Sequence, residues 1–340
     1  MRNYGILLIG CGHIGMQHLS DIYYRDNITV EAVSDINPES AVKVAKLYGA
    51  KRWSTDYKEL LKDKNIDIVI IATYTDSHLS ILRDCLKYGK HVLCEKPIAG
   101  NLEDGNEFVK LVKESETKVL VAHILRHNST YRRIKELVDS GAIGELRQIR
   151  MSQNHHTVKW ERYCRLMEDC SPTIDCGVHY YDVAQWISGS DICEVMGMAT
   201  KTQDDAPCNN YSLVQFKTEN GCTGFYESGW GQSIRAFNEK EFIGTKGRIT
   251  LRLQSQRAED AEEGDLITVF HSDSGVYETI NVKSIYKNMY GQIMCLINMI
   301  ENNAEAMPSI DEVYKAFKVA IAADRAINIG TKVRVLEYDK

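Results

Sequence analysis

Short apolar runs alternate with segments of helical spacing over residues 1–122 of the chain. This alternation is typical of βαβ units, which form a parallel sheet with helices on its faces. The predicted strands are the apolar runs Tyr4–Ile9, Ile28–Ser34, Lys51–Trp53, Asp67–Ala72, His91–Cys94 and Val119–Ala122. Helix signals stand between the runs: Asn37 suits an N-cap, Pro38 the first helical position and Gly49 the residue after the last turn. We therefore expect a first domain of α/β class over residues 1–122.

Beyond residue 122 the pattern changes to longer strand-like runs joined by turn residues. In chain order we predict a helix at Tyr131–Ser140, a strand at Leu146–Gln153, a helix at Ile174–Ile187, strands at Ile192–Thr202, Tyr211–Lys217, Cys222–Trp230, Glu239–Ile243, Arg248–Leu253, Leu266–His271 and Val276–Val282, helices at Tyr286–Ile300 and Ile310–Ile329, and a strand at Lys332–Leu336. Residues 219–221 and 244–247 are typical of hairpin connections. Residues 123–340 are thus predicted to form a second α/β domain, with a mostly antiparallel sheet and helices on one face.

The composition agrees with two domains in a globular chain. At roughly 150 residues per domain, 340 residues predict about two. The formal net charge of -6 disfavours nucleic acid and anionic membranes as partners. No apolar run approaches the roughly 20 residues of a membrane-spanning helix. The first apolar run is too short for a signal peptide, and the cysteines include no C-x-x-C pair, so we expect reduced thiols and a cytoplasmic protein.

A glycine-rich turn follows the first predicted strand and opens a helix, with the sequence Gly10-Cys11-Gly12-His13-Ile14-Gly15. In this pattern the first glycine permits a tight turn, the second lets the backbone approach a pyrophosphate, and the third lets the helix pack against the strand. Asp35 ends the second strand, where an acid accepts hydrogen bonds from ribose hydroxyls. The turn and the acid together predict a dinucleotide site; the alternative is a plain tight turn followed by an ordinary aspartate.

The residues around Asp35 also bear on which dinucleotide binds. A carboxylate at this position repels a 2′-phosphate on the ribose. The next residues, Ile36 and Asn37, supply no arginine to receive that phosphate. The sequence therefore favours NAD over NADP.

Glu95-Lys96-Pro97 follows the fifth predicted strand, at the edge where an open parallel sheet forms its ligand crevice. Proline allows the Lys96–Pro97 peptide bond to be cis at modest cost. A lysine near the positively charged nicotinamide has its pKa lowered by the like charge, which suits it to proton transfer. The alternative is a solvated lysine after an edge strand.

Asp175, His179 and Asp182 are spaced to share one face of the predicted helix over Ile174–Ile187. An aspartate beside a histidine orients the imidazole and stabilises its charged form, which suits removal of a proton from a hydroxyl group. One alternative is an ordinary surface pair. Another is a divalent metal site, but no third or fourth ligand is evident in the sequence, so we expect no metal.

Together these motifs resemble the Gfo/Idh/MocA oxidoreductases, the relatives of glucose-fructose oxidoreductase and inositol dehydrogenase. Three further segments carry the resemblance, Thr73-Tyr74-Thr75-Asp76-Ser77-His78, Gly141-Ala142-Ile143-Gly144-Glu145 and Gly244-Thr245-Lys246-Gly247. The resemblance implies a Rossmann domain, a second domain whose large open sheet mediates homodimers or homotetramers, and sugar or cyclitol substrates. It also implies that His179 is the general base, that Lys96 binds and polarises the reacting hydroxyl, and that Asp175 positions them.

The remaining site residues complete this picture. The resemblance places Thr73, His78 and Glu95 near the cofactor, and Arg126 near the substrate. His155 and Trp160 offer a polar donor and an aromatic platform for a polyol, in a segment whose alternative interpretation is a solvated basic loop. We therefore expect NAD-dependent oxidation of a secondary hydroxyl of a sugar, sugar derivative or inositol. The alternatives are an NAD-dependent glycosidase acting by transient oxidation and elimination, and a nucleotide-sensing regulatory protein.

Overall fold

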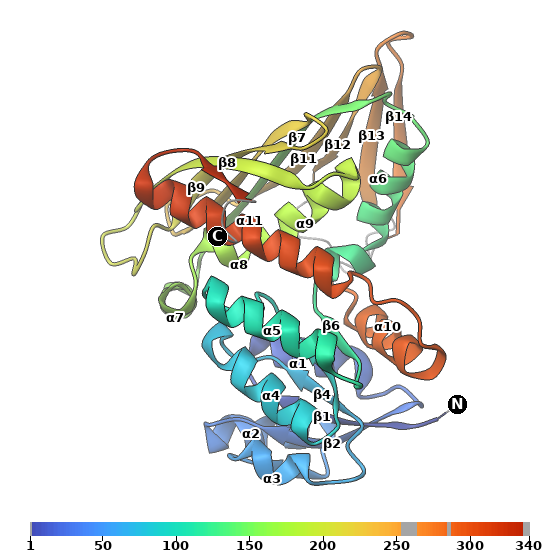
Figure 1. Ribbon diagram of the computed structural model, residues 1–340, viewed down its shortest axis with the longest axis vertical. Helices are drawn as coiled ribbons and strands as arrows, with labels where there is room; N and C mark the ends of the chain where they lie inside the picture. The colour runs from blue at the N-terminus through green and yellow to red at the C-terminus, as the bar shows by residue number, and fades with distance from the viewer. Residues whose placement is uncertain (1, 253–263, 284–286, 336–340) are drawn as a thin grey trace. The chain divides into compact units, whose positions relative to one another are not determined.

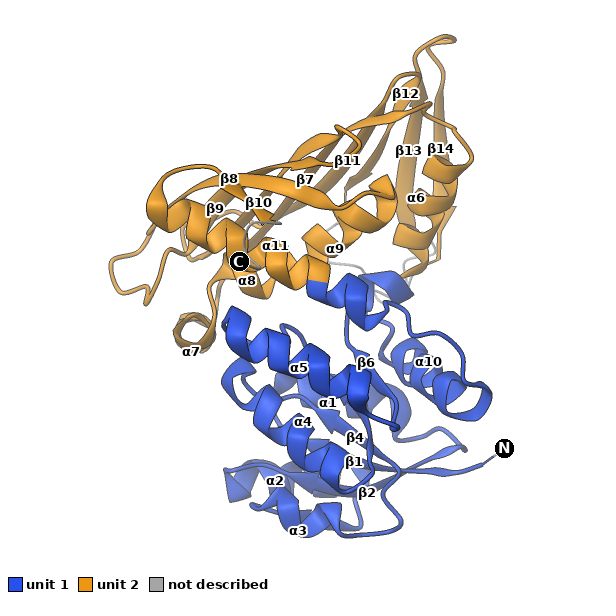
Figure 2. Cartoon of the chain, viewed as in Figure 1, with its two compact units in different colours: residues 1–127, 287–314 blue, residues 128–286, 315–340 orange. Residues whose placement is uncertain are grey.

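The chain divides into two compact units (Figures 1 and 2). Unit 1 comprises residues 1–127 and 287–314, and unit 2 comprises residues 128–286 and 315–340. The computed structural model describes residues 2–252, 264–283 and 287–335. No helix in these described ranges is long and apolar enough to cross a membrane.

Unit 1 contains a six-stranded parallel sheet with the order β3-β2-β1-β4-β5-β6. Its elements are β1 (Tyr4–Ile9), α1 (His13–Ile22), β2 (Ile28–Ser34), α2 (Pro38–Tyr48), β3 (Arg52–Ser54), α3 (Tyr57–Leu61), β4 (Ile68–Ile71), η1 (Thr75–Ser77), α4 (His78–Lys87), β5 (His91–Cys94), α5 (Leu102–Glu114), β6 (Val119–Val121), η2 (Ile124–His127) and α10 (Met289–Asn302). All six predicted strands are present. The strand order reverses between β1 and β4, which places a ligand crevice at the carboxyl ends of these strands.

The buried strands of unit 1 and the two ends of helix α2 form as the sequence predicts. Every residue of β1 and β4 is buried, as strands covered on both faces require. The Asn37 side chain caps α2 by accepting hydrogen bonds from the backbone N–H groups of Glu39 and Ser40, and Pro38 begins the helix. Gly49 ends α2 with a φ of 68°, a left-handed conformation that favours glycine. Residues 1–122 therefore fold as the pattern predicts.

Residues 287–314 correct the predicted domain boundary, which assigned all of 123–340 to the second domain. The apolar side chains Ile293, Leu296 and Ile297 of α10 are buried in one core with residues of α1 and of the parallel sheet. Periodicity shows that a helix has an apolar face but not which core receives it. Asn288 caps α10, and Tyr286, the predicted start of this helix, lies outside the described residues.

Unit 2 contains a nine-stranded sheet with the order β14-β13-β12-β11-β7-β10-β9-β8-β15. The elements of this part of the chain are α6 (Ser129–Asp139), β7 (Leu146–His156), α7 (Trp160–Asp169), α8 (Pro172–Asp175), α9 (Gly177–Ser188), β8 (Ile192–Thr200), β9 (Tyr211–Thr218), β10 (Thr223–Gly231), β11 (Phe237–Gly244), β12 (Gly247–Arg252), β13 (Asp265–His271), β14 (Tyr277–Val282), α11 (Ile310–Ile329) and β15 (Val333–Arg334). Adjacent strands are antiparallel except for the parallel pair β7 and β10. Leu253 and Leu336, which end two predicted strands, lie outside the described residues.

The two faces of this sheet differ in what covers them. Helices α6, α9 and α11 lie on one face (Figure 1). In register on that face are Met151, Tyr226 and Lys240, which are buried. On the opposite face, exposed side chains include Met198, which is 71% exposed. The predicted arrangement of helices on one face is confirmed.

Candidate active site

The turn between β1 and α1 is shaped by its three glycines. Gly10 has a φ of 95°, and a Cβ added there would lie 2.4 Å from the carbonyl oxygen of Ala72 at the end of β4. A Cβ on Gly15 would lie 2.0 Å from the carbonyl oxygen of Gly10, so α1 packs directly against the turn. A Cβ on Gly12 would meet no atom within 4 Å. The turn is thus closed on its inner side and open at Gly12, which leaves room for a dinucleotide pyrophosphate beside the backbone of His13 and the helix N-terminus.

Asp35 joins this turn to the end of β2. Its Oδ2 accepts a hydrogen bond from the Cys11 N–H at 2.8 Å, and its Oδ1 accepts one from the Asn37 N–H at 2.8 Å. Burial, followed by the charge of Asp35, raises the pKa of the Cys11 thiol to about 12, so this thiol is protonated at neutral pH. Ile36, next to Asp35, is 93% exposed.

Thr73 follows β4, and His78, the first residue of α4, lies between the loop after β4 and the loop after β5. The His78 side chain is buried, with Nδ1 2.8 Å from the Pro97 carbonyl oxygen and Nε2 3.2 Å from the Thr73 carbonyl oxygen. Ser77 donates its hydroxyl to Thr73 Oγ1 at 2.7 Å. Because both ring nitrogens face backbone carbonyls, His78 connects the two loops, and any effect on a cofactor passes through their positions.

Glu95 and Lys96 follow β5, and the Lys96–Pro97 peptide bond is cis. Glu95 Oε1 lies 2.8 Å from Nε2 of the buried His18 on α1, and its Oε2 accepts the Lys96 N–H at 3.3 Å. Burial opposes ionisation of Glu95, but the hydrogen bond and charge of His18, with the charges of Lys96 and Lys287, hold its pKa below the usual value. An ionised carboxylate therefore stands beside Lys96.

This lowered pKa predicts a pH dependence of stability. A group whose pKa is lower in the folded protein stabilises the fold above its unfolded pKa, and this stabilisation is lost as the pH falls through the folded pKa. From about pH 6 to pH 3, spanning the usual Glu pKa, the free energy of unfolding should fall more steeply in wild type than in Glu95→Gln. Urea titrations measure this difference, with the exposed Glu103→Gln as control. Equal slopes for wild type and Glu95→Gln would contradict the assignment.

Sequence reasoning missed His18 and Lys287 at this site. His18 shares the buried face of α1 with Gly15, Leu19 and Ile22. A histidine in that helical spacing was the available signal. Lys287, whose Nζ donates to Gln17 Oε1 at 2.8 Å, could not have been found, because it belongs to the segment that sequence analysis assigned to the other domain.

Arg126, which the resemblance places near the substrate, is buried in an ion pair. Its side chain on η2 is only 4% exposed, and its guanidinium lies 3.1 Å from a carboxylate oxygen of Glu312. The charge is used within unit 1, where it joins η2 to the start of α11. Arg126 is thus a buried ion-pair residue, and its contact with a substrate stays a prediction.

Asp175 and His179 lie in unit 2, on either side of a helix break. The predicted continuous helix is interrupted at Cys176, which separates α8 from α9. The Cys176 N–H donates to Pro172 O at 3.2 Å, and the His179 N–H donates to Cys176 O at 3.1 Å, which tightens the second turn. Asp175 and His179 are partly exposed, whereas Asp182 is buried, so these three side chains do not share one open face.

His155 and Trp160 lie at the end of β7 and the start of α7. The sequence favoured a polyol-binding segment or a solvated basic loop here, and the structure shows that this segment is helix α7 from Trp160 onward. Trp160 Nε1 donates to Asp205 Oδ2 at 2.7 Å. The Tyr163 ring centroid lies 6.4 Å from that of His155 and 5.3 Å from that of Trp230. Sequence reasoning missed Trp230, because only the register of β10 with β7 places it opposite His155.

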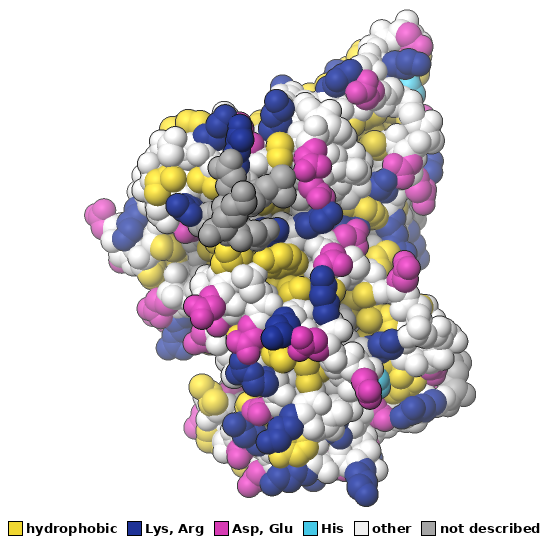
Figure 3. Space-filling model, in the orientation of Figure 1, with side chains coloured by type: hydrophobic (Ala, Val, Ile, Leu, Met, Phe, Trp, Pro, Cys, Tyr) yellow, Lys and Arg dark blue, Asp and Glu magenta, His cyan; other side chains and the backbone are white. Residues whose placement is uncertain are grey.

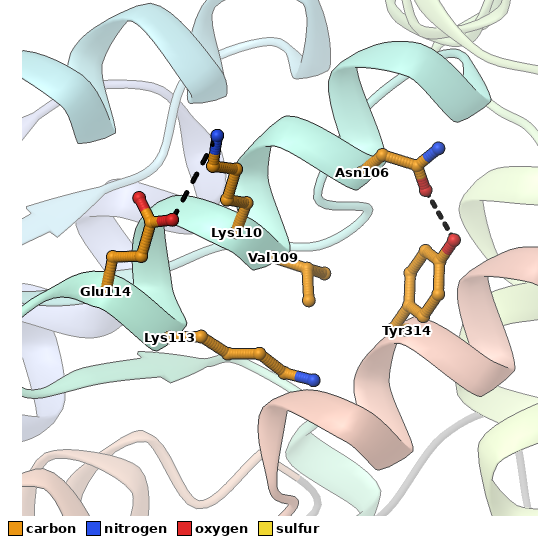
Figure 4. A pocket seen from close by; sticks show the side chains of 6 residues that line it. All are labelled: Asn106, Val109, Lys110, Lys113, Glu114 and Tyr314. Carbon is orange, nitrogen blue, oxygen red and sulfur yellow. Dashed lines mark hydrogen bonds and ion pairs between the residues drawn. The ribbon is translucent and has the colours of Figure 1, made fainter.

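The pocket on α5 lies outside the predicted site. A pocket of about 340 Å³ on α5 is lined by Asn106, Val109, Lys110, Lys113, Glu114 and Tyr314 (Figure 4), and it includes none of the motif residues. On the face drawn in Figure 3, cationic and anionic side chains are interspersed. Within the described ranges, no group of three or more His, Cys, Asp or Glu side chains is arranged to hold a metal ion.

Comparison with known proteins identifies the family. A model of the Gfo/Idh/MocA oxidoreductase family, NAD-binding Rossmann fold, matches residues 4–123, and a model of the GFO/IDH/MocA C-terminal domain matches residues 131–250. The chain is 25% identical over 247 residues to myo-inositol 2-dehydrogenase of Thermotoga maritima, and this alignment covers 71% of this chain and 73% of that protein. It is 28% identical over 262 residues to scyllo-inositol 2-dehydrogenase (NAD(+)) of Bacillus subtilis, which covers 73% and 74%.

A solved structure shows the same fold over nearly the whole chain. Scyllo-inositol dehydrogenase from Lactobacillus casei, with bound cofactor NAD(H) and scyllo-inositol, superposes with a TM-score of 0.79 at 22% identity, covering 98% of this chain and 100% of that one. Both parts of the chain thus match one family in sequence and in architecture. The chain belongs to the Gfo/Idh/MocA family of oxidoreductases, and its first domain is that family's NAD-binding Rossmann domain.

Proposed function

We propose that this oxidoreductase removes a hydride from a secondary hydroxyl carbon of a cyclitol, sugar or sugar derivative. The observation that carries the proposal is the arrangement in unit 1: Lys96, beside the ionised Glu95, follows β5 in the same sheet whose glycine turn is open at Gly12. A dehydrogenase needs a dinucleotide cradle and a proton-transfer group at one crevice. When bound, NAD⁺ accepts the hydride.

The proton-transfer set is Lys96, Asp175 and His179. In this proposal the Lys96 ammonium holds the oxygen of the reacting hydroxyl, and His179 takes the proton that leaves it as the carbon–oxygen double bond forms. Asp175 stabilises the imidazolium that results. Two electrons leave the carbon with the hydride and one proton leaves the oxygen, so the product is a ketone.

Two relatives direct the choice of substrates for the first assays. They are named for their action on myo-inositol and scyllo-inositol, so cyclitols are the first class to test. His155, Tyr163 and Trp230 support a polyol site in unit 2, because aromatic rings offer apolar faces and a histidine offers a polar donor.

The test is reduction of NAD⁺ by a panel of cyclitols, hexoses and aryl glycosides. The proposal expects stoichiometric NADH with at least one free polyol. Release of the phenol from an aryl glycoside with no net NADH would instead assign the protein to the NAD-dependent glycosidases. Tight binding of NAD⁺ with no turnover of any class in the panel would favour a nucleotide sensor.

Asp35 and Ile36 predict a preference for NAD⁺ over NADP⁺. A carboxylate facing the 2′-phosphate costs several kcal/mol, so the Kd for NAD⁺ should be at least about tenfold lower. The double substitution Asp35→Ser with Ile36→Arg should narrow or reverse this ratio, whereas Ile36→Arg alone, which keeps the carboxylate, should change it less. Calorimetric titration measures both dissociation constants. Tighter binding of NADP⁺ by wild type would refute the assignment.

The face of the nine-stranded sheet opposite helices α6, α9 and α11 supports a homodimer or homotetramer formed through unit 2. Exposed apolar side chains on it include Met196 and Met198. We expect wild type to be oligomeric in light scattering and Met198→Glu to shift it toward the monomer, because a buried unpaired charge destabilises an interface. Lys62→Glu, which changes an exposed side chain in unit 1, is the control. A monomeric wild type would contradict this proposal.

A further inference from the structure

Lys240, in the centre of unit 2, is an anomaly that the proposed mechanism does not use. It lies on β11, on the face of the sheet that carries the helices, and its side chain is 0% exposed. Its register partners Met151 on β7 and Leu251 on β12 are also fully buried. Lysines are almost never buried to this extent without specific partners. Its contacts therefore indicate what it does.

Among the described residues, the Lys240 side-chain nitrogen makes three polar contacts. Nζ donates to the carbonyl oxygen of Ser152 on β7 at 2.7 Å, and it also donates to Asn238 Oδ1 on its own strand. It lies 4.5 Å from the ring centroid of Tyr180 on α9, the distance of a cation–π contact. The amine thus joins two strands of the sheet to one residue of the helix above them.

That residue stands in the turn that carries the proposed proton-transfer pair. Tyr180 directly follows His179, and Cys176, which is close enough to Lys240 to affect its pKa, directly follows Asp175. The ring of Tyr180 stacks on that of Tyr226 with centroids 4.8 Å apart. Lys240 therefore lies beneath the short stretch of chain that begins at Asp175 and ends at Tyr180.

We propose that Lys240 is a positioning residue for Asp175 and His179, an inference that rests on the proposed function of that pair. The two oxygen contacts fix its ammonium against the sheet, and the contact with Tyr180 then fixes the first turn of α9. A displacement of about 1 Å in reacting groups can lower a rate about 100-fold. If the Lys240 side chain only filled space in the core, it would not need an amine, because a methionine side chain fills a similar volume.

The position of Lys240 has a second, measurable consequence. Burial lowers its pKa well below the usual value, and the charges of Cys176 and Glu239 only partly oppose this. The other titratable groups packed around it are Tyr180 and Tyr226, while β7 and β12 contribute Met151, the Ser152 carbonyl and Leu251, which do not titrate. Below the unfolded pKa the unfolded chain binds the proton more tightly, so this lysine destabilises the fold at neutral pH, and the effect disappears as the pH rises toward about 10.4.

The experiment compares Lys240→Met with Leu251→Met, a buried position in the same row without a charge. With NAD⁺ and scyllo-inositol or myo-inositol as probes, Lys240→Met should lower kcat by about 10- to 100-fold. Its KM, and both constants of Leu251→Met, should stay within about twofold of wild type. Because Lys240 acts through the turn, adding Lys240→Met to His179→Gln should cause no further loss. A kcat within about twofold of wild type, or losses that multiply in the double variant, would overturn the inference.

A readout that is independent of activity separates positioning from simple support of the fold. The Tm of Lys240→Met should equal or exceed that of wild type at about pH 7, and any gain should shrink toward about pH 10. A Tm below that of Leu251→Met would assign Lys240 a merely structural role. Lys240→Gln, which keeps a donor, repeats the test if the Met variant does not fold. If His179→Gln retains wild-type kcat, the proposed function fails; if only Lys240→Met retains it, this inference fails alone.

Discussion

Replacing His179 by Gln lowers kcat for polyol oxidation by about 100- to 10,000-fold, the range for removing a general base. The same loss is expected for Lys96→Ala, because the reacting hydroxyl then has no ammonium to hold its oxygen. For His179→Gln the Kd for NAD⁺ should remain unchanged, since the dinucleotide cradle lies in unit 1. Steady-state kinetics with NAD⁺ and the best polyol of the panel, together with calorimetry, measure both quantities.

Two control variants accompany this prediction. His156→Gln changes an exposed histidine next to the site, and Lys87→Ala changes an exposed lysine at the end of α4. Both should retain kcat within about twofold, as surface changes without shared partners do. If His179→Gln or Lys96→Ala behaves like these controls, the residue concerned has no part in proton transfer.

Gly15→Ala is expected to damage the fold, and Gly12→Ala is expected to damage only cofactor binding. A Cβ on Gly15 would meet the Gly10 carbonyl at 2.0 Å, so α1 must shift, with an expected loss of about 1–3 kcal/mol as in overpacked cores. Gly12 has a φ of −73° and open space around it, so alanine fits the unliganded turn without strain. Its methyl group would occupy the space beside the backbone that a pyrophosphate needs.

Thermal unfolding and NAD⁺ titration of the two variants test this pair of expectations. The Tm of Gly12→Ala should match wild type while its Kd for NAD⁺ rises at least about tenfold, equivalent to about 1.4 kcal/mol. Gly15→Ala should show a lower Tm. An unchanged Kd in Gly12→Ala would show that the dinucleotide does not approach the turn as proposed.

The features that depend on a few neighbouring residues could be predicted from the sequence. The glycine spacing, the Asn37 cap and the six apolar runs of the parallel sheet each depend on a few neighbouring residues, and each is present in the structure. The helix break at Cys176 was missed because residues 174–187 have an uninterrupted helical pattern, whereas in the structure the His179 N–H bonds to the carbonyl oxygen of Cys176, three residues back instead of four. Local pattern therefore predicted elements well and their interruptions poorly.

Long-range partners account for the other differences. The neighbours of Arg126 in the sequence give no sign of the ion pair that its guanidinium makes with Glu312, which lies 186 residues further along the chain. The β11 strand was predicted, and its alternation places Lys240 on the same face as the apolar Phe242, but the sequence does not show that this face is fully buried at Lys240. Such outcomes depend on which strand lies alongside and which helix covers the face, and these are properties of the assembled sheet.

The central claim, hydride transfer from a polyol carbon to NAD⁺, is tested most directly with scyllo-inositol deuterated at all its ring carbons, which are chemically equivalent. The protein is incubated with NAD⁺ and this substrate, and the reduced cofactor is examined by mass spectrometry and NMR. We expect one deuterium in each molecule of reduced cofactor and slower turnover than with unlabelled scyllo-inositol. Reduced cofactor without deuterium would contradict it.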